Sequence, residues 1–144
     1  MGILERTRHV VRADLNALLK KAKNPSIVLD AYLDDLEAVL AEAMSIRAAE
    51  EAERAMYAAR LRDLKATQQS WQAKAMHCLR RGDEDLARSA LEKKLDMQQE
   101  IDGLGEEIVQ HQENLDILEG SVEALRTRMQ EVLRTRRQLR FRHQ

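Results

Sequence analysis

The sequence contains few of the residues on which non-helical folds depend. It has one cysteine, one proline and five glycines, and its aromatic residues are one Trp, two Tyr and one Phe. A β-sandwich or barrel would need turn residues about every 8–12 positions, and a single cysteine cannot form an internal disulfide. We therefore expect neither a β fold nor a disulfide-stapled one.

Long hydrophobic runs are also missing. The longest stretch without Asp, Glu, Lys or Arg is residues 66–73, whereas a membrane-spanning helix needs roughly 20 consecutive apolar residues. Arg6, Arg8 and Arg12 interrupt the N-terminal region, where a secretion signal would need an apolar segment. We expect neither a transmembrane nor a secreted protein.

The sequence does have many charges of both signs, and they are unevenly distributed. Charged residues make up 34% of the chain, and the formal net charge is −1. By segment, however, residues 1–23 sum to +4, residues 24–125 to −11 and residues 126–144 to +6. A basic start, an acidic body and a basic end favour an interaction surface over a uniformly solvated coat.

Two short segments carry the signals of helix boundaries. Asn24 can cap a helix that begins at Pro25, because proline is tolerated at the first helical position. Farther along, two arginines precede Gly82, which can adopt the left-handed conformation that ends a helix. Asp83 can then cap the next helix. These signals predict two helices joined by a very short turn at Gly82 and Asp83.

The predicted fold is all-α: a long antiparallel coiled-coil hairpin over residues 24–144, preceded by a short N-terminal amphipathic helix. The arms, about residues 25–81 and 84–142, have similar lengths, which suits a hairpin. Apolar residues in the second arm alternate spacings of four and three, the 3.5-residue period of a left-handed coiled coil. This seam comprises Met97, Ile101, Leu104, Ile108, His111, Leu115, Leu118, Val122, Leu125, Met129, Val132, Arg136 and Leu139.

The first arm keeps the same spacing over residues 29–43 and 57–78, with a polar gap between them. In that gap a strict continuation would place Arg47, Glu50 and Arg54 in the seam. We therefore expect the stripe to shift locally onto a neighbouring set of apolar residues, an interruption that unwinds the supercoil. The expected set is Met44, Ala48, Ala52, Ala55 and Ala59.

Residues 1–23 predict a separate basic amphipathic helix, because their apolar and basic side chains fall on opposite sides of a helical wheel. Such a helix can lie at the headgroup boundary of an anionic membrane or occupy a protein groove. Alternatively, it can fold back on the hairpin. We expect membrane binding, with this segment free to reach lipid. The expected lipid-contacting residues are Ile3, Leu4, Arg6, Val10, Val11, Arg12, Leu15, Leu18, Leu19 and Lys20.

Several of these segments resemble the phage shock protein A family, which includes the vesicle-inducing protein in plastids. MGILER (residues 1–6) and VRADLNALLKKA (residues 11–22), followed by Asn24-Pro25, look like the start of that family. WQAKA (residues 71–75) with LRRGDEDLARSAL (residues 79–91) is similar to its hairpin-tip motif. The resemblance extends over the whole chain, although Leu4 stands where the family often has an aromatic residue.

The resemblance implies a membrane-stress protein related to the ESCRT-III superfamily. Members bind anionic lipid at the cytoplasmic face of the inner membrane through the N-terminal helix, and they assemble into homo-oligomers. Some also bind and inhibit a AAA+ transcription activator through the coiled coil. We expect the membrane scaffold as the function and the soluble regulator as the alternative, with no enzymatic activity.

No residue pattern predicts a catalytic, cofactor or metal site. His77 and Cys78 are adjacent and therefore point in different directions on a helix, and no second Cys or His pair stands nearby. His111 is expected to be a tolerated polar seam position, and a histidine there can respond to pH. Trp71 is interpreted as seam packing, with an anchor for a protein partner as the alternative.

The basic segment at residues 126–144 leaves three interpretations open. If the hairpin forms, its arginines lie beside acidic residues of the first arm, among them Asp30 and Glu42, and can pair with them. A second membrane-facing patch is the next possibility. Nucleic-acid binding is not expected, because the chain is slightly acidic overall and lacks aromatic stacking platforms.

Overall fold

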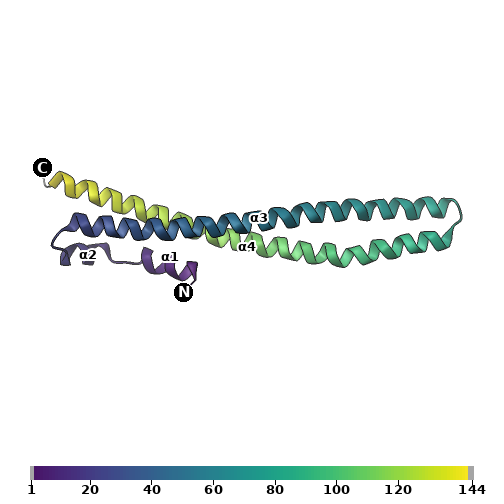
Figure 1. The fold of residues 1–144 in the computed structure, drawn as a ribbon, viewed down its shortest axis with the longest axis horizontal. Helices are drawn as coiled ribbons and strands as arrows, with labels where there is room; N and C mark the ends of the chain where they lie inside the picture. The colour runs from purple at the N-terminus through teal and green to yellow at the C-terminus, as the bar shows by residue number, and fades with distance from the viewer. Residues whose placement is uncertain (1, 143–144) are drawn as a thin grey trace. The chain divides into compact units, whose positions relative to one another are not determined.

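The part of the chain described by the computed structural model, residues 2–142, consists of helices joined by short connections. It forms α1 (Ile3–Val11), α2 (Leu15–Lys21), α3 (Pro25–Arg80) and α4 (Glu84–Arg142), and α3 and α4 run antiparallel as a hairpin (Figure 1). The predicted all-α hairpin is confirmed. Residue 1 of the predicted N-terminal segment and residues 143 and 144 of the predicted hairpin lie outside the described residues.

The chain divides into two compact units. The first contains residues 2–49 and 115–142, and the second contains residues 50–114. The first unit combines α1, α2, the start of α3 and the end of α4. The second contains only the remaining parts of α3 and α4 and the turn between them.

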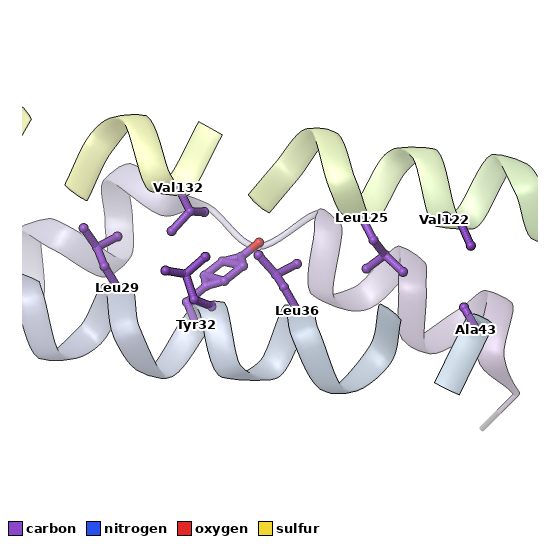
Figure 2. Close-up of a cluster of buried hydrophobic side chains, with 8 residues drawn as sticks. Leu29, Tyr32, Leu36, Ala43, Val122, Leu125 and Val132 are labelled. Atoms are coloured by element: carbon purple, nitrogen blue, oxygen red, sulfur yellow. The ribbon is translucent and has the colours of Figure 1, made fainter. Parts of the chain in front are cut away.

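The larger core lies in the first unit, where α1 and α2 add a further layer to the hairpin. Its buried side chains are Leu29, Tyr32, Leu33, Leu36, Ala43, Val122, Leu125 and Val132, most of which are seen in Figure 2. Within residues 50–114, the second unit, Ile101 and Leu104 are the only large apolar side chains that are buried, and they are still 6% and 7% exposed. A helix pair alone covers less of its own seam than a pair covered by further helices.

The turn has the conformation that the sequence predicts. Gly82 has a φ of +79°, the left-handed region that glycine adopts at little cost. The Gly82 N–H donates to the carbonyl of Leu79 at 3.1 Å, and the Asp83 N–H donates to that of Cys78 at 2.9 Å. These two bonds form a Schellman motif, which satisfies carbonyls at the end of α3. The Asp83 carboxylate then accepts from the Leu86 N–H at 3.2 Å and caps α4.

The predicted seam of α4 is buried or half-buried at every position. The expected shift in α3 is wrong, however. Of its five residues only Ala59 is half-buried, and Met44, Ala48, Ala52 and Ala55 are exposed. Arg47, Glu50 and Arg54 are half-buried instead. The strict spacing therefore continues through a polar stretch. Charge pairing makes this possible, because Arg47 pairs with Glu119 at 2.7 Å in the first unit and Glu50 pairs with His111 at 2.5 Å in the second.

The single helix expected over the N-terminal segment is divided into two in the structure. α1 ends at Val11 and α2 begins at Leu15. Asp14 has an extended backbone and its carboxylate accepts from the Ala17 N–H at 3.1 Å. A short acidic side chain that caps the following turn competes with helix continuation at its own position, so Asp14 starts a new helix.

Candidate functional site: the docked N-terminal helices

The apolar side of α1 and α2 packs against the core of the first unit. The partly buried side chains in this contact include Ile3, Val10, Val11, Ala13, Leu15 and Leu19. Thr7, at the centre of α1, is only 5% exposed. The expectation that this segment lies free is therefore wrong, and the alternative in which it folds back on the hairpin is the arrangement observed. The physical reason is that the hairpin surface near Leu29 and Leu36 is apolar. When α1 and α2 pack on it, they make the kind of contact that lipid would otherwise offer.

Tyr32 and Arg128 hold the C-terminal end of α1 in place. The Tyr32 hydroxyl donates to the carbonyl oxygen of Val10 at 2.5 Å and accepts from Arg128 Nε at 3.0 Å. Another nitrogen of the Arg128 guanidinium donates to the carbonyl oxygen of Ala13. Carbonyls in the last turn of a helix have no partner within it. The hairpin therefore supplies hydrogen bonds that α1 and the following linker cannot make for themselves.

The charge of Arg128 suits this position. Its guanidinium is directed toward the negative end of the α1 dipole, and it also bonds to Glu131 at 2.9 Å. Hydrogen bonding to Tyr32, followed by that to Glu131, raises the pKa of Arg128. The group is therefore a permanent cation at the joint between α1 and α2.

Two further polar groups of α1 face the hairpin, with opposite effects. The Arg6 guanidinium forms an ion pair with the Glu42 carboxylate of α3. The hydroxyl of Thr7 is buried and has no hydrogen-bond partner among the described residues. The ion pair favours docking. The unpaired hydroxyl opposes it, because a buried donor gives up its hydrogen bonds to water without forming one to the protein.

The side of α1 and α2 that faces away from the core is basic. Arg8, Arg12, Lys20 and Lys21 are exposed, and an open depression of about 500 Å³ lies along α1, lined by Glu5, Arg8, His9, Arg12 and Ala13. Leu4 and Leu18 are also partly open, 40% and 39% exposed. The docked segment thus presents positive charge outward while it keeps most of its apolar side covered.

The structure separates the ten predicted lipid-contacting residues into three groups. Ile3, Val10, Val11, Leu15 and Leu19 pack on the core; Leu4, Arg12, Leu18 and Lys20 are exposed; Arg6 is paired with Glu42. Sequence reasoning missed Thr7, Tyr32, Glu42, Ala13 and Arg128 as partners in this contact. Only Tyr32 gave a signal, as a lone aromatic beside an otherwise aliphatic seam.

Trp71 lines a second surface feature, near the hairpin turn. The Nζ atoms of Lys74 and Lys93 lie 4.4 and 4.7 Å from the centroid of its ring, within the range of cation–π contacts. The ring borders an open groove of about 580 Å³ between α3 and α4, with Cys78, Leu86 and Ala90 among its lining residues. Trp71 is half-buried and so is not enclosed by the seam.

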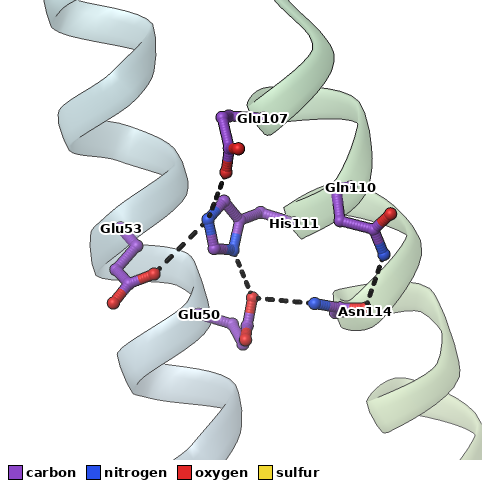
Figure 3. A network of polar contacts seen from close by, with 6 residues as sticks. All are labelled: Glu50, Glu53, Glu107, Gln110, His111 and Asn114. Carbon is purple, nitrogen blue, oxygen red and sulfur yellow. Dashed lines mark hydrogen bonds and ion pairs between the residues drawn. The ribbon is translucent and has the colours of Figure 1, made fainter. Parts of the chain in front are cut away.

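A polar cluster occupies the seam of the second unit (Figure 3). His111 Nδ1 lies 2.5 Å from Glu50 Oε2, and Nε2 lies 3.3 Å from Glu53 Oε2 and 3.8 Å from Glu107 Oε2. Hydrogen bonding to Glu50 raises the pKa of His111, and the same bond lowers the pKa of Glu50. Within residues 2–142, no group of acidic, histidine or cysteine side chains has a geometry that could hold a metal ion.

The basic end of α4 pairs with acidic residues of α3 at one point. Arg136 contacts Asp30 at 3.1 Å, as the pairing interpretation predicts. Arg134, Arg137 and Arg140 are exposed and line a shallow surface on α4.

Comparison with known proteins identifies the family. The sequence profile of the PspA/IM30 family matches residues 2–144. This chain belongs to the PspA/IM30 family. The resemblance seen in the sequence is thereby confirmed, and the division of α1 and α2 described above falls within the matched region.

Curated PspA/IM30 relatives are similar over much of this chain. A phage shock protein A homolog of Bacillus subtilis is 32% identical over 72% of this chain and 46% of its own length. A phage shock protein A homolog of Deinococcus radiodurans is 28% identical over 92% of this chain and 59% of its own. The membrane-associated protein Vipp1 of Synechocystis is 35% identical over 65% of this chain and 35% of its own. The chain thus spans between about a third and three-fifths of the length of these relatives.

Within residues 2–142, no helix is both long enough and apolar enough to cross a bilayer.

Proposed function

We propose that this protein is a membrane-stress scaffold that binds anionic lipid peripherally, at the cytoplasmic face of the inner membrane, through residues 3–21. The observation that carries the proposal is the two-sidedness of α1 and α2: one side is apolar, and the other exposes Arg8, Arg12, Lys20 and Lys21. A short helix of this kind binds at the headgroup boundary by combining buried apolar area with attraction to anionic lipid. The Synechocystis relative, named a membrane-associated protein, supports it.

Vesicle flotation with a charge variant tests the proposal without disturbing the docked contact. Arg8, Arg12 and Lys20 are exposed in the structure, so Arg8→Gln/Arg12→Gln/Lys20→Gln leaves the packed side intact. Each basic residue near an anionic surface contributes about 1 kcal/mol. We therefore expect the triple variant to bind vesicles containing an anionic phospholipid at least tenfold more weakly. Neither protein should bind vesicles made only of phosphatidylcholine.

The matched control removes three charges elsewhere. Lys65, Arg80 and Arg81 are exposed in the second unit, and Lys65→Gln/Arg80→Gln/Arg81→Gln makes the same change in net charge. We expect this control to bind as the unaltered protein does. Equal losses in both triple variants would show that net charge alone drives binding and would overturn the assignment to residues 3–21.

Self-association is the expected mode of action for such a scaffold. Large apolar side chains on the outer side of the second unit support it: Leu95 and Val109 of α4 are 67% and 58% exposed. They are fourteen residues apart and so lie on one side of the helix. We expect Leu95→Lys/Val109→Lys to lower the average mass measured by light scattering, and an unchanged mass would exclude this side as the contact.

The groove beside Trp71 favours a second candidate function, inhibition of a AAA+ transcription activator. A large aromatic residue in a partly open groove is typical of an energetic anchor, and Lys74 and Lys93 would favour an acidic partner segment. We expect Trp71→Ala to abolish both co-purification with such an activator and inhibition of its ATPase. Met56→Ala, which removes an exposed apolar side chain outside the groove, is the control, and equal effects of the two changes would reject this role for the groove.

A further inference from the structure

The apolar side of α1 and α2 cannot contact the hairpin and a membrane at the same time. Ile3, Val10 and Leu19 pack against the core of the first unit, and Thr7 is 5% exposed. Insertion into lipid would need these same side chains. The two contacts are therefore alternatives, and whatever stabilises one lowers the population of the other.

We propose that Tyr32 and Arg128 form a latch that holds residues 3–21 on the hairpin and so limits their binding to anionic lipid. The proposal rests on the lipid-binding function proposed above. It places the control of binding in two residues of the hairpin, neither of which belongs to the segment that would contact lipid.

The latch acts on the joint between the two short helices. The Tyr32 hydroxyl caps the carbonyl of Val10 at 2.5 Å and is itself oriented by Arg128 Nε at 3.0 Å. The same guanidinium reaches the carbonyl of Ala13. The contacts thus join the end of α1 and the linker to both arms of the hairpin. Because they are made to backbone atoms, they depend on the position of the segment and not on its side chains.

The basic side of the docked segment gives lipid a way to open the latch. Arg8, Arg12 and Lys20 are exposed while the apolar side is covered, so an anionic surface can attract the protein before the helices leave the hairpin. Close to that surface, Arg6 can also exchange the Glu42 carboxylate for lipid phosphate. Electrostatic attraction would then offset the loss of the docked contacts, and neutral membranes would leave the latch closed.

The size of the expected change in lipid affinity follows from the fraction of molecules in which residues 3–21 are undocked. When only a minor fraction of molecules is undocked, apparent lipid affinity scales with that fraction. Loss of one hydrogen bond typically changes an equilibrium about fivefold. Tyr32→Phe should therefore raise the affinity for anionic vesicles about fivefold, and Arg128→Met, which removes bonds to Tyr32 and Ala13, should raise it more. Since Arg128→Met removes a positive charge, a simple electrostatic effect would have the opposite sign.

The experiment measures docking and lipid binding separately in this 144-residue chain. Hydrogen exchange of the backbone amides in residues 3–21, without lipid, reports docking, and flotation with phosphatidylglycerol-containing vesicles reports binding. Arg126→Met and Tyr57→Phe are the matched controls, because neither side chain is bonded to residues 3–21 among the described contacts. Far-ultraviolet circular dichroism verifies that each variant remains helical, and the conservative Tyr32→Phe keeps the test usable if Arg128→Met does not fold.

The proposal expects both latch variants to exchange faster in residues 3–21 and to bind anionic vesicles more tightly than the controls. Unchanged exchange, or faster exchange with vesicle binding equal to that of the unaltered protein, would overturn the latch while the lipid-binding function stood. Absence of vesicle binding by every protein tested would overturn the lipid-binding function, and with it the purpose assigned to the latch.

Discussion

His111 Nδ1 of α4 lies 2.5 Å from Glu50 Oε2 of α3, and the same imidazole stacks on Tyr57 with a centroid separation of 5.4 Å. The other ring nitrogen faces Glu53 and Glu107. With carboxylates at both nitrogens, the ring is most stable when both carry a proton and donate. The surrounding carboxylates thus favour the protonated imidazole at a seam position that coiled coils normally fill with an apolar residue.

We predict that the stability of the hairpin falls as the pH rises through the folded-state pKa of His111. Its pKa is raised above the ordinary value of 6.5 by the hydrogen bond to Glu50, so the folded state binds the proton more tightly than the unfolded state. The resulting stabilisation is fully present below pH 6.5 and is lost above the raised pKa. Glu50 has the opposite dependence: its pKa is lowered, so its contribution is present above pH 4.5 and is lost on acidification.

Urea midpoints measured across this range check the prediction. His111→Gln should reduce the fall in urea midpoint that accompanies a rise in pH above 6.5. His77→Gln, at an exposed position, should leave that fall unchanged. The same decline in the His111→Gln variant would assign the pH dependence to other groups.

The polar cluster also shows where sequence reasoning reached its limit. The 3.5-residue spacing correctly located the seam of α4, including His111, because burial along a helix pair follows periodicity. The interruption expected in α3 was wrong, because an argument from periodicity counts charged residues such as Arg47 and Glu50 as unsuited to a buried seam whatever their partners are. Their partners, Glu119 and His111, are distant in sequence, and only the register of the two helices brings them together.

One substitution, Gly→Ala, should have opposite effects at two positions. A Cβ would meet no atom within 4 Å at Gly82 or at Gly103, so only backbone conformation decides the outcome. Gly82 has a φ of +79°, where a side chain costs about 1–2 kcal/mol. Gly103 lies inside α4, where alanine is favoured by about 1 kcal/mol. We expect the urea midpoint to fall for Gly82→Ala and to rise for Gly103→Ala. A fall in both would indicate a packing role that the open surroundings of Gly103 do not explain.

The cost of removing a seam leucine should depend on the unit in which it lies. Leu36 is fully buried beneath α1 and α2 in the first unit, so Leu36→Ala should cost about 2–5 kcal/mol. Leu64 is only half-buried in the second unit, and Leu64→Ala should cost about half as much or less. Urea denaturation measures both. Equal costs would mean that the N-terminal helices add little cover to the core.

The N-terminal segment was predicted correctly in its chemistry but not in its arrangement. The helical wheel found which side chains share the apolar side, and five of the seven apolar residues expected to contact lipid, Ile3 and Leu19 among them, do pack together on the core. It could not choose between lipid and hairpin, since both offer an apolar surface. It also continued the helix past Asp14, because a helical wheel takes no account of the hydrogen bond that the Ala17 N–H donates to the Asp14 carboxylate.

A substitution at Thr7 distinguishes a docked N-terminal segment from a free one, because the two cases predict changes in vesicle binding of opposite sign. Its hydroxyl is buried against the hairpin without a partner among the described residues, which costs about 1–3 kcal/mol. At a membrane boundary the same hydroxyl could bond to water or headgroups. Thr7→Val should therefore stabilise the docked state more than the lipid-bound state.

We expect Thr7→Val to slow amide exchange in residues 3–21 and to weaken binding to anionic vesicles by at least about fivefold, the factor that corresponds to 1 kcal/mol. Thr127→Val, at an exposed position of α4, should change neither quantity. If residues 3–21 were instead free in solution, the extra methyl group would simply add apolar area and tighten binding. Stronger vesicle binding by Thr7→Val would therefore show that the docked arrangement does not compete with lipid.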